Sequence, residues 1–157
     1  MSIAGIDPGK TGALSIIYPD RSVQAWDVPL QKKGKKELPS WNQWQRQWAG
    51  ALELGDVDMI VIELVAARPG QGVTSMFNFG RTLGFAHSIA CGAGVPVHFV
   101  TPAVWKRQLG LIGADKNASR EKFRELFPTS DKLVARVKDG GRADAALIAE
   151  YGRRKLF

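Results

Sequence analysis

Two carboxylates lie at the ends of apolar segments, where an unpaired charge is costly to bury. Asp7 follows the run SIAGI and precedes a Pro-Gly turn, and Glu63 lies near the end of DMIVIEL, the most apolar stretch of the chain. A structural alternative for Glu63 is a salt bridge with a basic neighbour such as Arg68. Taken singly, either acid is better explained by such a structural pairing, and a chemical role becomes the favoured interpretation only if a third acid reaches the same edge.

A third acid is placed by helical spacing. Asp144 begins an i, i+3, i+4, i+7 pattern that is completed by Leu147, Ile148 and Tyr151. The pattern predicts that Asp144 lies on the apolar stripe of a helix, near its N-terminus and facing a sheet. Asp139 lies just upstream in KDGGRAD, where two glycines allow the chain to fold back.

Acids that converge from separate elements repel one another unless a cation neutralises them. Mg²⁺ prefers carboxylate oxygens, waters and phosphate oxygens as ligands. Two such ions can activate a water and stabilise the leaving oxygen during phosphodiester cleavage. We therefore interpret Asp7, Glu63 and Asp144 as Mg²⁺ ligands, with two ions expected per site.

The elements that must position these acids are strands and helices in a characteristic order. Short turns join the first three strands, which favours an antiparallel meander, and the later strands alternate with helices. The expected fold class is α/β, with a mixed five-stranded sheet of three antiparallel strands followed by parallel strands, flanked by helices, in one domain over residues 1–157. This is the element order of the ribonuclease H-like fold. The expected strands cover residues 2–7, 13–18, 22–28, 58–64 and 96–100.

Helices are expected between and after these strands. Trp41, Trp44 and Trp48 share one helical face, which suits either a platform for stacking DNA or, as we favour, packing on a sheet. The segment QKKGKKELP is expected to be a polar loop. The expected helices cover residues 41–54, 74–91, a short stretch from 102, 116–127 and 142–154.

The formal net charge of +7 favours a polyanionic partner such as nucleic acid, although a merely basic domain would carry the same charge. No apolar run approaches the roughly 20 residues that span a bilayer, so no membrane partner is expected. The single cysteine, Cys91, fits a reducing cytoplasm, and with two histidines it gives no indication of a zinc site.

The loop DPGKTG has two other interpretations. Its Gly-Lys-Thr resembles the end of a phosphate-binding P-loop, but that pattern needs a glycine where the chain has Ala4. The loop also resembles the first phosphate loop of actin-like ATPases and sugar kinases, whose chains are usually much longer. An ATP-dependent phosphotransferase and a catalytically silent DNA-binding module are therefore the alternative functions.

Five tracts together resemble the RuvC family of Holliday junction resolvases, most closely its phage-type members. They are IDPGKTGA, VIELVAARPGQGVTSMFNFGRTLG, TPAVWKRQLGL, ADKNASRE and KDGGRADAALIAEYG, in the family's order and within residues 3–152. The resemblance implies a ribonuclease H-like homodimer that nicks opposed strands of four-way junctions in the host cytoplasm, and the sequence leaves open whether other branched DNA is cut too. It also implies dependence on Mg²⁺, with Mn²⁺ as a substitute.

By this resemblance the catalytic, metal-binding acids are Asp7, Glu63, Asp139 and Asp144. Several family members carry an acid three residues before the last one, where this chain has Gly141. Asp139 is assigned instead by analogy with phage-type members.

Two lysines match basic positions of the family: Lys106 in VWKRQ and Lys116 in ADKNAS. A cation at either position could hold the scissile phosphate or stabilise charge in the transition state. The alternative for each is an ordinary surface lysine.

Further DNA contacts are expected from the basic segments and from GQGVTSMFNFGR. Phe77 or Phe79 could stack at the open centre of a junction, although core packing of one of them is as good an interpretation. Small residues in the helix of 74–91 suit a two-fold dimer that would place two sites on opposed strands. The expected DNA-binding residues are Lys10, Lys32, Lys33, Lys35, Lys36, Gln71, Phe77, Phe79, Arg81, Lys106, Arg107 and Lys116.

Overall fold

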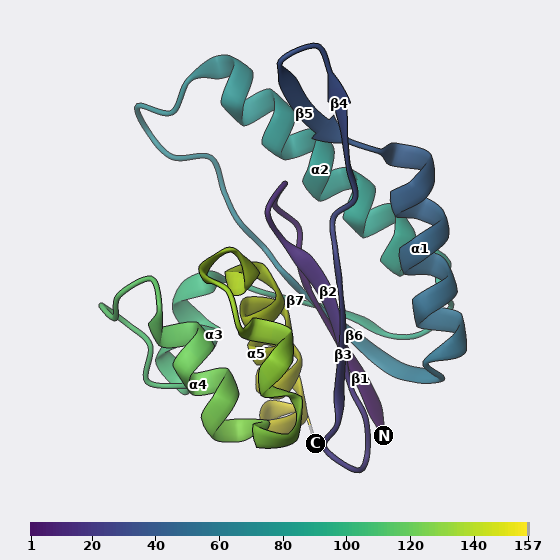
Figure 1. Cartoon of the computed structure of the whole chain (residues 1–157), viewed down its shortest axis with the longest axis vertical. Helices are drawn as coiled ribbons and strands as arrows, with labels where there is room; N and C mark the ends of the chain where they lie inside the picture. Colours follow the sequence, from purple (N-terminus) through teal and green to yellow (C-terminus); the bar gives the residue numbers. More distant parts are fainter. Residues whose placement is uncertain (157) are drawn as a thin grey trace.

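A mixed five-stranded sheet lies at the centre of the molecule (Figure 1). The computed structural model describes residues 1–156. The sheet contains β1 (Ser2–Asp7), β2 (Ala13–Ile17), β3 (Val23–Asp27), β6 (Val57–Glu63) and β7 (Val97–Val100). Its strand order is β3-β2-β1-β6-β7, with antiparallel pairing from β1 to β3 and parallel pairing from β1 through β6 to β7. The predicted sheet is confirmed.

Helices cover both faces of this sheet, with α1 and α2 on one side and α3, α4 and α5 on the other (Figure 1). Their bounds are α1 Trp41–Leu54, α2 Val73–Gly92, α3 Pro102–Gln108, α4 Ala118–Leu126 and α5 Gly140–Lys155. Two 3₁₀ segments, Pro128–Val134 and Val137–Asp139, connect α4 to α5 and were not predicted. Within residues 1–156, no helix is both long enough and apolar enough to cross a membrane.

The strand residues alternate between two apolar clusters, one on each face of the sheet. Ile3, Met59 and Val61 pack towards α3–α5, whereas Ile6 and Ile62 pack towards α1 and α2. The latter cluster also contains Trp44 and Trp48, which are fully buried. The core-packing interpretation of the tryptophan face is therefore confirmed for these two residues.

The segment that we predicted as a polar loop is a β-hairpin instead. It pairs β4 (Leu30–Lys33) with β5 (Lys36–Pro39), and the turn contains Gly34 at φ +62°. Most of its side chains are exposed, so the hairpin buries no apolar face that could have produced an alternating hydrophobic pattern. The loop prediction was wrong for this reason.

Helix α5 lies unusually close to β1 and to the turn that follows it. A Cβ atom at Gly5 would collide with the backbone of Ala145 and Ala149, and one at Gly141 would collide with the Thr11 carbonyl. Glycine at these two positions allows the middle of α5 to lie directly on β1 and its first turn to lie against the β1–β2 turn.

Candidate active site

Asp7 and Glu63 lie side by side at one edge of the sheet. Strands β1 and β6 are parallel and pair Ile6 with Ile62, so the two acids are the next residues of neighbouring strands. The Gly9 amide donates a hydrogen bond to Asp7 Oδ1 at 3.2 Å. The carboxyl edge of parallel strands is where α/β folds commonly place a site.

Asp144 reaches the same edge from the first turns of α5, as its helical spacing predicted. Its Oδ1 atom is inaccessible to solvent and has no hydrogen-bond partner among residues 1–156. Burial raises the pKa of Asp144, while the Ser119 side chain and the Lys106 charge act to lower it. This acid is therefore held near the sheet without a compensating hydrogen bond on one oxygen.

Burial and the neighbouring acids perturb the pKa values of Asp7 and Glu63. Burial, followed by repulsion from Glu63 and Asp144, raises the pKa of Asp7 to about 7, against the opposing effects of Gly9 and Lys106. Burial also raises the pKa of Glu63, and the Asp144 charge raises it further. Such an arrangement disfavours three negative charges at neutral pH unless a cation neutralises them.

Two consecutive residues of α3 act on this acid cluster, one by a hydrogen bond and the other by its charge. The indole Nε1 of Trp105 donates a hydrogen bond to Glu63 Oε1 at 2.8 Å, and the charge of Lys106 lowers the pKa of all three acids. Arg68 lowers the Glu63 pKa through its charge but forms no ion pair with Glu63 within the described chain. The salt-bridge alternative for Glu63 is thus replaced by the indole contact.

The donor set suits a hard divalent cation. Its members are carboxylates from separate elements, and one of their oxygens is buried without a partner, so Mg²⁺ would supply both ligand bonds and the missing charge. In residues 1–156, however, no three His, Cys, Asp or Glu side chains converge tightly enough to hold an ion. The acids are close enough to perturb each other's pKa, and ion binding would have to draw them together.

Asp139 is oriented by arginines rather than by the other acids. Its Oδ2 accepts the Arg136 amide at 2.9 Å, its Oδ1 is 2.8 Å from Arg136 Nη2, and Arg142 Nη1 lies 4.0 Å away. Burial acts to raise the Asp139 pKa, but these arginine contacts outweigh it and lower the pKa. The structure therefore brings Asp7, Glu63 and Asp144 together and gives Asp139 a different set of partners.

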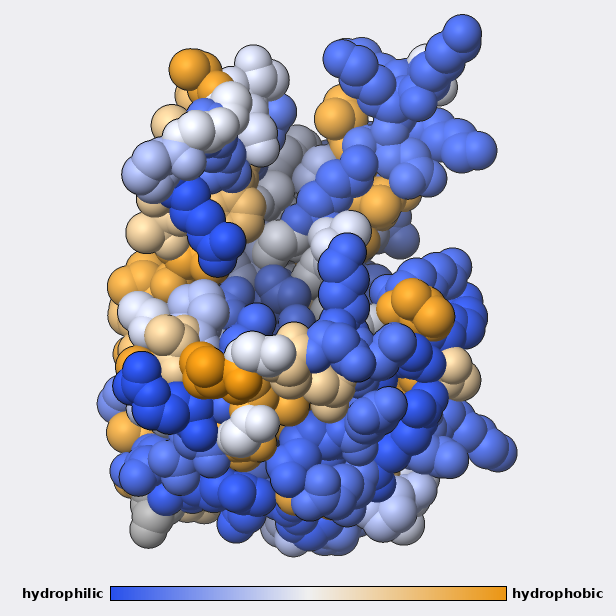
Figure 2. Space-filling model, turned by 90° about the vertical axis from the view of Figure 1, so that its left-hand side faces the viewer, coloured by the Kyte–Doolittle hydropathy of each residue, from blue (hydrophilic) through white to orange (hydrophobic). Residues whose placement is uncertain are grey.

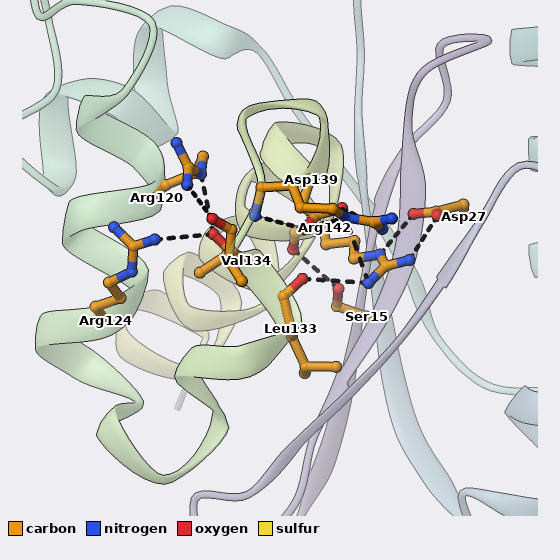
Figure 3. A network of polar contacts seen from close by, with 10 residues as sticks. Ser15, Asp27, Arg120, Arg124, Leu133, Val134, Asp139 and Arg142 are labelled. Atoms are coloured by element: carbon orange, nitrogen blue, oxygen red, sulfur yellow. Dashed lines mark hydrogen bonds and ion pairs between the residues drawn. The ribbon is translucent and has the colours of Figure 1, made fainter.

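The arginine network around Asp139 also fastens the connection into α5 (Figure 3). Arg142 donates to both carboxylate oxygens of Asp27, each at 2.7 Å, and to the Leu133 carbonyl at 3.2 Å. Arg120 and Arg124 both donate to the Val134 carbonyl at 3.0 Å. These contacts fix the start of α5, and hence Asp144, against β3 and α4.

A groove of about 1210 Å³ lies beside the acid edge, between the β4–β5 hairpin and α2. Figure 2 shows this hollow between two raised walls, of which the hairpin wall is strongly hydrophilic. Lys10, three residues after Asp7 on the β1–β2 turn, lines the end of the groove. The other predicted DNA-binding residues that line it are Lys32, Lys33, Lys35, Lys36, Phe79 and Arg81.

The remaining predicted contacts lie outside this groove. Phe77 is 67 % exposed on α2, and Phe79 is partly buried and lines the groove, so neither is among the residues of the two core clusters. Gln71, which precedes α2, donates a hydrogen bond to Oγ of Ser75 in the first turn of that helix at 3.5 Å. Arg107 and Lys116 are exposed on α3 and on the loop before α4, respectively.

A second buried acid was missed by the sequence analysis. Glu150 is fully buried on α5 and receives ion pairs from Arg21 at 2.7 Å, Arg153 at 2.8 Å and Arg154 at 2.7 Å. Burial acts to raise its pKa, but the three arginines lower it to about 2. Arg21 joins from the β2–β3 turn, 129 residues away, and local spacing could not have revealed that partner.

The fold is shared with resolvases of known structure. Thermus thermophilus RuvC in complex with a Holliday junction substrate superposes with a TM-score of 0.69 at 19 % identity, covering 98 % of this chain and 95 % of RuvC. The fowlpox virus Holliday junction resolvase superposes with a TM-score of 0.52 at 15 % identity over 100 % of both chains. These similarities define a RuvC-like α/β fold, as predicted.

The sequence also matches a curated protein that is named as a Holliday junction resolvase. Chloroplastic Holliday junction resolvase MOC1 of Chlamydomonas reinhardtii is 37 % identical over 95 residues, covering 57 % of this chain and 10 % of the relative. The chain thus spans about a tenth of that relative's length. No family model matches the chain. With the fold, this match confirms the resemblance to RuvC-like Holliday junction resolvases.

Proposed function

We propose that this chain is a divalent-metal-dependent endonuclease that nicks opposed strands of four-way DNA junctions. The observation that carries the proposal is the cluster of Asp7, Glu63 and Asp144, whose pKa values are all raised, beside a lysine-lined groove. Carboxylates that burial and mutual repulsion disfavour are suited to binding cations. The named relatives act on Holliday junctions, which supports the same substrate here.

Each residue of the site has a distinct proposed role. Asp7, Glu63 and Asp144 would hold two Mg²⁺ ions, or Mn²⁺ in their place, and these ions would activate water and stabilise the leaving oxygen. Lys106 lies near enough to all three acids to affect their pKa values, so its ammonium group can orient the scissile phosphate. Lys116 would contact the phosphate from the opposite loop. Asp139 would become a fourth ligand only if its carboxylate left the ion pair with Arg136 and bound the metal instead.

The groove and the exposed face of α2 provide the proposed DNA surface. The hairpin lysines, Lys10 and Arg81 would neutralise phosphates along one arm, and exposed Phe77 would stack on bases at the junction centre. Two copies are proposed to pair along α2, where Val73 is 81 % exposed and Gly80 and Gly84 leave room for close approach. Two-fold symmetry would then present one site to each opposed strand. The proposed location is the cytoplasm, where the free, exposed Cys91 would stay reduced.

A cleavage assay tests this function directly. A labelled four-way junction and a duplex of matched sequence are incubated with the protein, with and without Mg²⁺. We expect paired nicks in the junction only when Mg²⁺ is present. Cleavage of duplex at the same rate, or junction cleavage in excess chelator, would contradict the proposal, and ATP-dependent phosphate transfer would favour the kinase alternative.

The hairpin offers a second test that concerns binding. Replacing Lys32, Lys33, Lys35 and Lys36 with alanine removes four charges from exposed positions without touching the core. Junction affinity should fall and depend less steeply on salt, because fewer counterions are released. An unchanged salt dependence would remove the hairpin from the DNA surface.

A further inference from the structure

Trp105 is buried in an unusual setting beside the acid cluster. Its side chain has no exposed surface and packs in the core between the sheet and α5, yet its one polar atom donates to Glu63 Oε1 at 2.8 Å. A buried tryptophan commonly finds a partner for its N–H. Here that partner is one of the three carboxylates of the proposed metal site.

The same indole ring also lies beneath Lys106. The Lys106 ammonium is 5.3 Å from the ring centroid of Trp105, within the range of a cation–π contact. One rigid side chain therefore contacts both an acid and the cation of the site. Because core packing fixes the orientation of the ring, the ring restricts the positions of both the Glu63 carboxylate and the Lys106 ammonium group.

We propose that Trp105 is a positioning residue that presents Glu63 to the metal, an inference that rests on the proposed function. The indole N–H occupies Oε1, which leaves Oε2 of Glu63 for the ion and fixes the rotation of the carboxylate plane. Partners that orient a ligating carboxylate in this way typically affect metal affinity about 10- to 100-fold. The contact with Lys106 keeps the ammonium group beside the same carboxylates.

The chain contains a matched control for removal of the indole N–H. Trp48 is also fully buried, but its Nε1 has no hydrogen-bond partner among the described residues. Trp105→Phe and Trp48→Phe each remove the same atoms from a core position. Only the first of them removes a hydrogen bond to a proposed metal ligand.

The test is Mn²⁺ binding to the full chain without DNA, measured by isothermal titration calorimetry. Trp105→Phe should raise the Mn²⁺ dissociation constant about tenfold or more, whereas Trp48→Phe should change it less than about twofold. In a Glu63→Gln background, Trp105→Phe should cause no further change in Mn²⁺ affinity, because the indole acts through Glu63. If Trp105→Phe binds Mn²⁺ as tightly as wild type, this inference is overturned while the proposed function stands.

Two further outcomes are distinguishable. If wild-type protein binds no Mn²⁺, the proposed function itself fails and this inference fails with it. If Trp105→Phe does not fold, benzothienylalanine incorporated at position 105 keeps the bicyclic shape and lacks the N–H. Its Mn²⁺ affinity should fall as for the phenylalanine variant, and an unchanged affinity would overturn the positioning role.

Discussion

The two ends of α5 hold buried acids in opposite electrostatic situations. Near its N-terminus, Asp144 faces Asp7 and Glu63, and burial and mutual repulsion raise the pKa of Asp7 to about 7. Near its C-terminus, Glu150 is surrounded by three arginines that lower its pKa to about 2 despite burial. A buried acid thus stabilises the fold where its charge is paired within the chain. Where the charge is not paired, it creates a site that a cation can fill.

Asp7→Asn tests the acid cluster at the N-terminal end of α5 and should have the largest effect. We expect a loss of cleavage of about a hundredfold or more, comparable to the removal of a charge-stabilising group, with junction binding retained. The free energy of unfolding of the metal-free protein should not fall, because the change removes like-charge repulsion. Cleavage assays and chemical denaturation measure both. Near-wild-type cleavage would show that Asp7 is not a ligand.

The pH dependence of the free energy of unfolding should have opposite signs for Asp7, in the acid cluster, and for Glu150, in the arginine cluster. The pKa of Asp7 is raised from 3.8 to about 7 in the fold, so the native state holds the proton more tightly, and its stability should fall as pH rises between these values. The pKa of Glu150 is lowered from 4.5 to about 2. Its contribution is therefore present above pH 4.5 and is lost as pH falls towards 2.

Denaturation of metal-free protein across this pH range checks both directions. Asp7→Asn should abolish the decline towards neutral pH, and Glu150→Gln should flatten the decline at low pH. A wild-type protein that becomes steadily more stable from pH 4 to pH 7, with Asp7→Asn behaving identically, would contradict the raised pKa of Asp7.

Glu150→Gln tests the paired end directly. The change leaves three arginines around a neutral amide, and breaking such a pair is costly, but the arginines are partly exposed and screened by solvent. We expect a loss of about 2 kcal/mol in the free energy of unfolding. Metal affinity should be unchanged. A variant as stable as wild type would mean that the arginine cluster contributes little.

Asp139→Asn should have the smallest effect. Its partner Arg136 is 55 % exposed, so we expect a loss of about 1 kcal/mol from the weakened cap and ion pair, with little change in metal dependence. Denaturation and a Mg²⁺ titration of cleavage measure the two quantities. A hundredfold loss of cleavage that added metal partly restores would instead identify Asp139 as a fourth ligand.

The sequence predicted those parts of the site that local pattern determines. Apolar runs ending in Asp7 and Glu63 predicted strand ends, parallel neighbours predicted their shared edge, and helical spacing turned Asp144 towards the sheet. The sequence could not reveal partners that only the tertiary fold brings together, such as Arg21 with Glu150 and Trp105 with Glu63.

Two other features also depended on information that hydrophobic pattern does not carry. The β4–β5 hairpin is mostly exposed, so its strands left no apolar alternation in the sequence. Asp139 as a metal ligand stays a prediction, but its local ion pair with Arg136, three residues before it, was not predicted. Charge spacing at i, i+3 was the signal available there.

The most direct test of the central claim is a calorimetric titration of Mn²⁺ into wild type, Asp7→Asn and Glu150→Gln at pH 7, repeated in two buffers of different ionisation enthalpy. We predict that wild type and Glu150→Gln bind alike and release protons on binding, because the cation displaces the proton that Asp7 retains at this pH. Asp7→Asn should bind much more weakly and release fewer protons. Equal binding by wild type and Asp7→Asn, or no binding by wild type at millimolar Mn²⁺, would contradict a cation site built on these three acids.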